Sequence, residues 1–215
     1  MQAGSGGGAP HSVERIDLLI QQVLRLTHPL HFGQPQSPGQ LEAALRLRFQ
    51  TAVSQGWIAA GDFPSGLETD PYDDVALHIV ALDGSTVVGT TRIVLPASGR
   101  RLPIEEAFAW QSDGRTVDVG RACVDSQYRE GTHRVFLGLL AAVWTEMRNR
   151  GFTQCCGVVS AKVMLLYKRL GLEVSRLAPP RIYWGEERWP VLVRPQEAGD
   201  QLDTAVRGLE DGRSK

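Results

Sequence analysis

Four acidic side chains are concentrated just before an alternating apolar segment of the chain. Glu68, Asp70, Asp73 and Asp74 lead into VALHIVALDGSTVVGTTRIVLP, whose alternation is typical of half-buried strands. Carboxylates this close together repel one another and lose solvation if they are buried. The cluster is therefore either a solvated, turn-forming loop or one wall of a pocket that holds a cation.

A second group of chemically active side chains lies in the strand-like segment RTVDVGRACV, residues 115–124. Asp118 and Arg121 are three residues apart, and Gly120 between them indicates a bulge or the close approach of a ligand. Asp118 could accept a proton while Arg121 holds it, or the two could form an ordinary cross-strand ion pair. His78 is another candidate base, because histidine titrates near neutral pH.

The elements that must position these residues follow from periodicity and turn residues. Amphipathic helices are predicted over residues 12–28 and 41–57, separated by a loop rich in Pro and Gly. Residues 74–96 predict two strands joined at Asp83-Gly84. Then follow a short helix, the strand that carries Asp118, a long helix, a strand containing Gly157, a helix ending at Gly171 and two last strands. This order favours a mixed sheet with helices on its faces.

The chain of 215 residues fits a single domain, which we expect over residues 12–198, including a helical extension at its N-terminus. Residues 1–11 are predicted to be a flexible leader. Residues 199–215 are polar and lack aromatic side chains, so we expect a loosely ordered tail.

Composition excludes several classes of function. The 23 Lys+Arg and 24 Asp+Glu residues give no reason to expect a nucleic acid or an anionic membrane as partner. No segment is apolar enough for a membrane span, and no signal-peptide core is visible. The three cysteines lie in apolar runs without a CxxC motif, which argues against a disulfide framework, a zinc site and a catalytic thiol. We expect a cytoplasmic protein without a metal or a tightly bound cofactor.

The strand, loop and helix in VDVGRACVDSQYREGTHRVFLGLL, with MLLYKRLGLEV after them, resemble the GNAT acyltransferase superfamily over roughly residues 45–195. The resemblance implies an α/β (α+β) fold with a mixed, mostly antiparallel twisted sheet, flanking helices and a splayed strand pair near Gly120 and Gly157. The thioester arm of an acyl donor would lie in this gap, against Gly120, Ala122, Cys123, Val124 and Val158. Its acyl chain would lie among the apolar residues beneath, namely Phe136, Leu139, Leu140, Val143, Trp144 and Val158.

The loop QYREGTH departs from the pyrophosphate loop of that superfamily. Arg129 and Gly131 match the usual pattern, but His133 stands where a second small residue is expected and would obstruct a diphosphate. A donor with a single phosphate fits better, which implies the acyl-phosphopantetheine thioester of acyl carrier protein. The alternative is a changed loop that still accepts coenzyme A.

Four motifs, in order, are similar to those of long-chain N-acyl amino acid synthases and acyl-homoserine-lactone synthases. They are an Arg-aromatic helix leading to Gly-Trp, an Asp-x-x-Asp pair, a Gly-x-x-Arg strand end and a Glu-x-x-Arg strand. The matching residues are Arg46 or Arg48 with Phe49 and Trp57, Asp70 with Asp73, Gly89 with Arg92, and Asp118 (in place of Glu) with Arg121. The segment RRLPIEEAFAW looks more like the N-acyl amino acid branch.

The resemblance implies a role for each of these residues. Arg48, Trp57, Asp70, Asp73 and Arg92 would bind the acceptor, with Asp70 and Asp73 beside its ammonium or another cationic group.

Direct attack of an amine on the thioester needs a base, because an alkyl ammonium is mostly protonated at neutral pH. Asp118 is the first candidate, and Arg121 would hold it or bind a carboxylate of the acceptor. Backbone N–H groups freed near Gly120 would stabilise the oxyanion. Tyr167 resembles the GNAT tyrosine that protonates the departing thiolate.

The expected activity is therefore transfer of a long-chain fatty acyl group from acyl carrier protein to an amine, forming an amide. The acceptor would be an amino acid or an amine side chain, including one on a peptide. The alternatives are an acyl-homoserine-lactone synthase using S-adenosylmethionine, a coenzyme A-dependent N-acetyltransferase and an inactive acyl-binding module.

Overall fold

The computed structural model describes residues 12–129, 133–198 and 201–213. The predicted leader, residues 1–11, and Gly131 of the predicted donor loop lie outside this part of the chain. The helices are α1 (Val13–Leu26), α2 (Pro38–Ser54), α3 (Pro103–Ala107), α4 (Arg134–Asn149), α5 (Ala161–Arg169) and α6 (Gln201–Arg213). The strands are β1 (His31–Gly33), β2 (Leu77–Asp83), β3 (Thr86–Val94), β4 (Val117–Val124), β5 (Cys155–Ser160), β6 (Val174–Arg176), β7 (Arg181–Tyr183) and β8 (Glu186–Val193).

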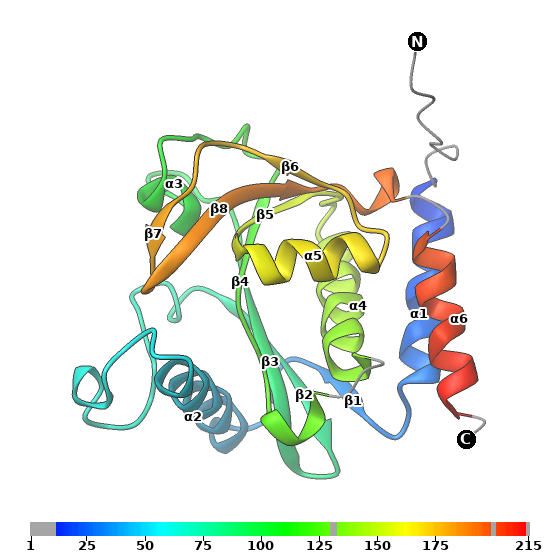
Figure 1. The fold of residues 1–215 in the computed structure, drawn as a ribbon, viewed down its shortest axis with the longest axis horizontal. Helices are drawn as coiled ribbons and strands as arrows, with labels where there is room; N and C mark the ends of the chain where they lie inside the picture. The colour runs from blue at the N-terminus through cyan, green and yellow to red at the C-terminus, as the bar shows by residue number, and fades with distance from the viewer. Residues whose placement is uncertain (1–11, 130–132, 199–200, 214–215) are drawn as a thin grey trace.

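Within the described residues, eight strands form one sheet in the order β1-β2-β3-β4-β5-β8-β6, with β7 paired to β8. The paired strands are antiparallel except for β4 and β5, which run parallel. Helix α2 lies on one side of the sheet, and α4 and α5 lie on the other (Figure 1). The predicted fold class, a mixed and mostly antiparallel sheet with flanking helices, is confirmed.

Serine side chains cap the starts of the first two helices. Ser12 accepts a hydrogen bond of 3.2 Å from the backbone N–H of Arg15 at the start of α1. Ser37 accepts one from Gln40 at the start of α2, where Pro38 occupies the first helical position.

Strand β1 was not predicted, because three prolines around it indicated a loop. It is held against β2, and its Phe32 packs on Gly138 of α4, where an added Cβ would lie 2.1 Å from the Phe32 ring. Strand β7 was also not predicted. In the part of the chain that the structure describes, no helix has the length and apolar character needed to cross a membrane.

The expectation of a loosely ordered C-terminal tail was wrong. Residues 201–213 form α6, which lies alongside α1 at the edge of the molecule (Figure 1). Leu202, Val206 and Leu209 recur at helical spacing and are buried against α1 and α4. Helix α6 thereby adds to the burial of the apolar stripe of α1, which also packs against α4. The prediction failed because it rested on the polar composition of the tail and did not take this single stripe of apolar residues into account.

Strands β4 and β5 separate after a very short parallel pairing. They pair only at Val117 with Cys155 and at Asp118 with Cys156, and both strands then continue without pairing with each other. The last close approach is at Gly157, where an added Cβ would lie 2.6 Å from the carbonyl oxygen of Val119. The predicted gap between the strands is therefore present, and Gly157 stands at its closed end.

The predicted bulge in β4 is also present, one residue further along than expected. Thr90 pairs with Cys123 and Arg92 with Gly120, so Thr91 faces two residues of β4. Arg121, rather than Gly120, takes the left-handed conformation, with φ of 56°. The Thr91 hydroxyl donates a hydrogen bond of 3.0 Å to the carbonyl oxygen of Gly120 and fixes this distortion.

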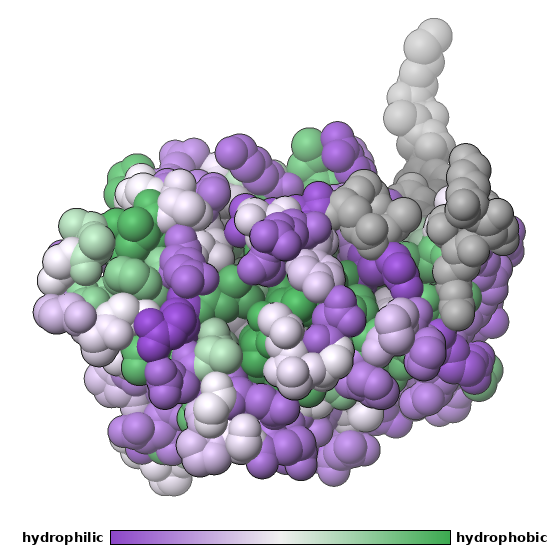
Figure 2. Space-filling model, turned by 90° about the horizontal axis from the view of Figure 1, so that it is seen from below, coloured by the Kyte–Doolittle hydropathy of each residue, from purple (hydrophilic) through white to green (hydrophobic). Residues whose placement is uncertain are grey.

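Some hydrophobic residues are exposed on the face of the molecule shown in Figure 2. Most of this face is hydrophilic, but hydrophobic residues gather on its left side and near its middle.

Candidate active site

A cavity of about 170 Å³ lies where β4 and β5 separate. One wall comes from α2, the residues that follow it and the β7–β8 turn, and the opposite wall comes from α4 and α5. The turn reaches the α2 side of the sheet, since a Cβ at Gly185 would lie 3.4 Å from the Cα atom of Trp57. Predicted site residues that line the cavity are Arg48, Trp57, Arg92, Asp118, Gly120, Arg121, Ala122, Cys123, Val158 and Tyr167.

The carboxylates of the acidic cluster bind arginine side chains of the protein itself. Arg48 binds both oxygens of Asp73 at 2.7 and 3.0 Å and forms an ion pair with Glu68. Arg92 binds both oxygens of Asp70 at 2.6 Å and one oxygen of Asp73 at 2.7 Å. These paired guanidinium and carboxylate groups, completed by Arg121, are called the ionic cluster below.

Burial makes the ionic cluster sensitive to the loss of any member. The side chains of Arg48 and Glu68 are only 2% and 1% exposed. Burial alone would raise the pKa of Asp73, but Arg48 and Arg92 outweigh it and lower the pKa to about 2. The pKa of Asp70 is also lowered, because Arg92 and Arg121 outweigh its burial. Asp70 and Asp73 therefore stay ionised at neutral pH, and each of the three carboxylates has a neighbouring guanidinium.

This arrangement corrects one expectation about the acceptor. Asp70 and Asp73 do not present open carboxylates to a cationic acceptor, because their oxygens hold Arg48, Arg92 and Arg121. Both aspartates also lie outside the lining of the cavity. Of the two competing arginines in α2, Arg48 is in the ionic cluster, whereas Arg46 is exposed and pairs with Glu42.

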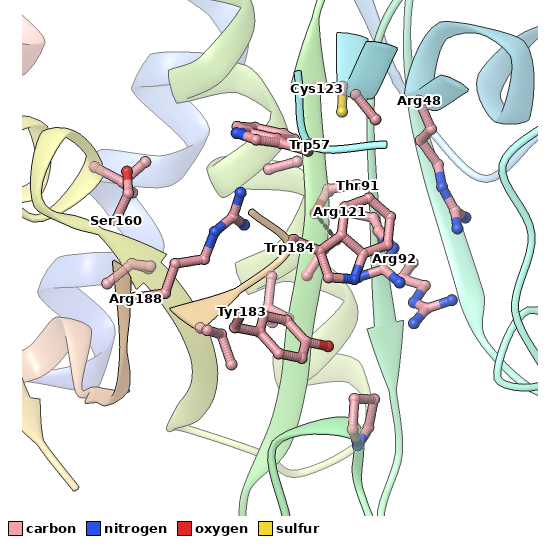
Figure 3. A pocket seen from close by; sticks show the side chains of 18 of the residues that line it. Arg48, Trp57, Thr91, Arg92, Arg121, Cys123, Ser160, Tyr183, Trp184 and Arg188 are labelled. Carbon is pink, nitrogen blue, oxygen red and sulfur yellow. Dashed lines mark hydrogen bonds between the residues drawn. The ribbon is translucent and has the colours of Figure 1, made fainter. Parts of the chain in front are cut away.

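Arg121 does not pair with Asp118, which corrects a second expectation. The bulge turns its side chain toward Glu68 and Asp70, with contacts of 3.1 and 2.9 Å. Trp184 covers the other side of the guanidinium, with the ring centroid 3.9 Å from the guanidinium carbon (Figure 3). Arg121 therefore closes the ionic cluster, and Asp118 has no guanidinium partner among the described residues.

Asp118 lines the cavity next to the point where the strands separate. Its side chain is 5% exposed, and its Oδ2 atom accepts a hydrogen bond of 2.9 Å from the backbone N–H of Ile104. Burial raises the pKa of this carboxyl to about 6, against smaller lowering effects of the Ile104 hydrogen bond, Arg92 and Arg121. A carboxyl with this pKa is ionised at neutral pH and can readily take up a proton.

The alternative base, His78, does not line the cavity. Its Nε2 atom lies 3.1 Å from the backbone carbonyl oxygen of Asp73, at the far side of the ionic cluster. The geometry therefore favours Asp118.

Tyr167 projects from α5 into the cavity and stacks on Phe136 of α4, with ring centroids 6.2 Å apart. Burial raises the pKa of its phenol, so the hydroxyl keeps its proton at neutral pH. This state is the one required of a proton donor.

The three thiols are protonated and unsuited to nucleophilic attack. Burial raises the pKa of Cys123 to about 11 and that of Cys155 to about 12, and it also raises the pKa of Cys156. The described residues contain no group of three or more His, Cys, Asp or Glu side chains that could hold a metal ion.

The predicted donor residues are only partly brought together. Gly120, Ala122, Cys123 and Val158 line the cavity, whereas Val124, Arg129 and His133 lie outside its lining. The Arg129 side chain donates a hydrogen bond of 2.9 Å to the carbonyl oxygen of Val124.

His133 stands immediately before α4 in the left-handed conformation, with φ of 53°. This backbone conformation favours glycine, so the position keeps the geometry of a glycine loop but carries an imidazole.

A smaller apolar cavity of about 90 Å³ lies next to the first one, between the sheet and helices α1 and α4. The two cavities share the lining residues Val119, Leu140, Val159 and Tyr167. Of the apolar residues expected around an acyl chain, Phe136, Leu139, Leu140 and Val158 line the first cavity, and Leu140, Val143 and Trp144 line the second. Ile16, Ile20 and Leu202 close the far end, so α1 and α6 also contribute to this apolar space.

Several residues that line the cavity were not predicted as site residues from the sequence. Glu68 was noted only as part of the acidic cluster, although it lines the cavity and pairs with Arg48 and Arg121. Trp184 and Arg188 reach the cavity from the β7–β8 hairpin. The signal that could have found this hairpin is Tyr-Trp-Gly-Glu, a two-residue turn in which Trp184 and Gly185 have φ of 53° and 70°.

Solved structures with similar folds include acyl-homoserine-lactone and N-acyl amino acid synthases. A CoA-dependent acyl-homoserine lactone synthase, BjaI, has 23% sequence identity and a TM-score of 0.65, and the match covers 80% of this chain and 83% of BjaI. The AHL synthase LasI has 17% identity and a TM-score of 0.62, over 83% of this chain and 94% of LasI. FeeM, an N-acyl amino acid synthase from uncultured soil microbes, has 16% identity and a TM-score of 0.61, over 77% of this chain and 91% of FeeM. These similarities show the shared fold.

A search of curated proteins found no match. A family model described as "N-acyl amino acid synthase FeeM" matches residues 43–192, from α2 to β8. The matched segment contains the ionic cluster, the gap between β4 and β5, Asp118 and Tyr167. Because this match spans well over half of the chain, the protein belongs to the FeeM family of N-acyl amino acid synthases, which are N-acyltransferases.

Proposed function

We propose that this protein transfers a long-chain fatty acyl group from the thioester of acyl carrier protein to the amine of an amino acid. The observation that carries the proposal is the position of Asp118, a buried carboxyl with a pKa of about 6 beside the gap between β4 and β5. A thioester in that gap would present its carbonyl carbon close to a group that can accept the proton of an attacking amine.

The apolar cavity beyond the gap supports a fatty acyl donor. Its walls are almost entirely aliphatic and aromatic, and Leu140 and Val159 line both this cavity and the first one. An acyl chain that enters past Tyr167 would bury its methylene groups there, each contributing about 0.8 kcal/mol.

The proposed reaction needs no covalent enzyme intermediate. The neutral amine attacks the thioester carbonyl, and a C–N bond forms while the C–S bond breaks. Asp118 takes the proton that the nitrogen loses, and the Tyr167 hydroxyl gives a proton to the leaving thiolate. Bulk solvent then restores both groups. Backbone N–H groups of β4, which has no β5 partner beyond Asp118, are available to the oxyanion.

The ionic cluster serves this reaction by holding the distorted segment of β4. Arg121 lies at the bulge, and its contacts to Glu68 and Asp70 tie that segment to the loop after α2. We infer that Arg48 and Arg92 position this loop and do not contact the acceptor directly. Trp57 remains a candidate for direct contact with the acceptor, since it lines the cavity.

His133 supports acyl carrier protein as the donor. An imidazole at a position that favours glycine narrows the space next to the first turn of α4, where a diphosphate would bind. A single phosphate makes fewer backbone contacts and tolerates this side chain. Replacement of His133 by Gly should therefore shift the ratio of kcat/KM values from acyl carrier protein toward coenzyme A. An unchanged ratio would remove this argument.

The activity is tested with purified protein, acyl carrier protein loaded with saturated chains of different lengths, and the proteinogenic amino acids. Mass spectrometry should find N-acyl amino acids, heavier than the amino acid by the acyl group minus one hydrogen. A parallel reaction contains S-adenosylmethionine. Release of an acyl-homoserine lactone there, with no product from any amino acid, would contradict the proposal and favour the lactone synthase.

A further inference from the structure

The cavity contains one arginine that the ionic cluster does not use. Three guanidinium groups and three carboxylates compensate one another within that cluster. Arg188 lies outside it, on β8 opposite Ser160 of β5, and its side chain is 13% exposed. Figure 3 shows its guanidinium extending into the cavity toward Trp57.

Arg188 is under-compensated for a buried cation. Among the described residues, its Nε and Nη2 atoms have no hydrogen-bond partner, although Nη2 lies 2.9 Å from a carboxylate oxygen of Glu186. Burial lowers its pKa, the charge of Arg121 lowers it further, and Glu186 opposes these effects. The face of the guanidinium lies over the Trp57 ring, 4.3 Å from its centroid. The group is thus held in place by stacking on Trp57 and by the ion pair with Glu186, while its Nε–H donor has no partner among the described residues.

A planar guanidinium with unused donors is suited to an anion with two oxygens, above all a carboxylate. The limited exposure of the Arg188 side chain strengthens such a contact, because few water molecules compete for its donors. The anion of an amino acid acceptor is its α-carboxylate, one carbon away from the amine that must approach the thioester.

The position of Arg188 favours the acceptor over the donor. Its guanidinium stands on the side of the sheet that carries α2 and Trp57, whereas the apolar walls for the acyl chain come from α4 and α5. The phosphate of the donor would bind near the start of α4. Phe136 and Leu140 of this helix line the cavity on the side opposite Arg188. Asp118 lies between the two sides, next to the separation of the strands.

We propose that Arg188 binds the α-carboxylate of the acceptor and that Trp57 holds the guanidinium in the receiving orientation. This inference rests on the proposed function and specifies its acceptor as a free α-amino acid. It replaces the expectation that Arg121 binds the carboxylate, because Arg121 is engaged by Glu68, Asp70 and Trp184.

The test compares acceptors that differ only in the carboxylate. The best amino acid substrate of the wild type is assayed beside its α-amide and its decarboxylated amine, with the wild type and Arg188→Gln. We expect Arg188→Gln to raise KM for the amino acid about 10- to 100-fold, as for loss of a charge-assisted contact. The preference for the amino acid over the amide should fall toward one, and KM for acyl carrier protein should stay within about twofold.

Arg176→Gln is the matched control. Arg176 also lies over a tryptophan, 5.5 Å from the Trp189 ring centroid, but it is exposed and lies outside the cavity lining. This control should keep the wild-type preference. Thermal unfolding should find Arg188→Gln at least as stable as the wild type, since it removes a poorly compensated buried charge. A merely structural Arg188 would instead lower the melting temperature and impair all three acceptors equally.

Further results would also overturn the inference. If Arg188→Gln raises KM for acyl carrier protein and leaves the preference for the amino acid intact, the anion is the phosphate of the donor. If neither changes, Arg188 binds no substrate anion. Calorimetric titration of the proteinogenic amino acids into wild type and Arg188→Gln keeps this test separate from turnover. If the wild type shows no turnover but binds an amino acid, and Arg188→Gln does not bind it, the proposed function is contradicted and this inference is supported. If both proteins bind the amino acids equally, or neither binds any, the inference is contradicted.

Discussion

The carboxyl group of Asp118 accepts a hydrogen bond of 2.9 Å from the backbone N–H of Ile104. This contact ties the strand that opens the cavity to the start of α3. It also orients a buried acid that has no guanidinium partner, so the group combines a fixed position with a raised pKa of about 6. The first two predictions concern this single side chain.

Asp118→Asn should abolish most of the activity. The amide cannot accept the proton of the amine, so we expect kcat to fall about 10²- to 10⁴-fold. In the wild type, kcat at saturating substrates should rise with pH around a midpoint near 6, where Asp118 ionises. The residual rate of the variant should lack this midpoint. Asp113→Asn, at an exposed position before the same strand, is the control, and a shared midpoint in both variants would exclude Asp118 as the base.

The same substitution should increase the stability of the fold at neutral pH. The pKa of Asp118 is raised from 3.8 to about 6, so the folded state binds its proton more tightly than the unfolded chain. The contribution of this group to stability is therefore complete below pH 4 and is lost as the pH rises through 6. The loss amounts to at most about 3 kcal/mol, from roughly two pKa units. Urea unfolding of wild type and Asp118→Asn between pH 4 and 8 should show the difference growing in favour of the variant. A constant difference would contradict the raised pKa.

Arg48→Met should strongly destabilise the protein, because it leaves Glu68 and Asp73 as buried charges with fewer partners. We expect a loss of about 3–5 kcal/mol in the free energy of unfolding. Arg46→Met, two residues earlier in α2, removes an exposed pair with Glu42 and should cost less than about 0.5 kcal/mol. Urea denaturation of both variants measures the contrast, and similar losses would show that the ionic cluster is not a buried unit.

Gly157→Ala should impair donor binding. The added methyl group would lie 2.6 Å from the backbone oxygen of Val119, so one strand must move where the gap closes. We expect KM for the acyl donor to rise at least about tenfold, together with a loss of stability of about 1–3 kcal/mol. Gly61→Ala is the control, because its Cβ would meet nothing within 4 Å. Normal donor binding in Gly157→Ala would mean that the thioester arm lies elsewhere.

Tyr167→Phe tests proton donation to the leaving thiolate. With the phosphopantetheine thioester, kcat should fall by about 10²-fold or more, because a basic thiolate must leave unprotonated. With an aryl thioester, whose thiolate leaves readily, the variant should approach the wild-type rate. An equal loss with both donors would show that Tyr167 only packs against Phe136.

The sequence by itself determined the order of most elements and the family. Helix caps, the hairpin at Asp83-Gly84 and the glycine inside β5 are local signals, so they could be predicted without knowledge of distant contacts. The ordered motifs around Arg48, Asp70 and Arg92 likewise indicated the correct group of acyltransferases. Helix α6 was not predicted, because its stripe of apolar residues gains stability only from its contacts with α1 and α4 in the folded protein.

The tertiary structure alone decided which charges meet. Arg121 and Glu68 are far apart in the sequence, and the bulge in β4 brings them together by turning a side chain away from Asp118. Arg188 enters the cavity because the β7–β8 hairpin folds onto the end of α2. The physical reason is that an ion pair depends on distance and burial in three dimensions, whereas spacing along the chain shows only which partners are available.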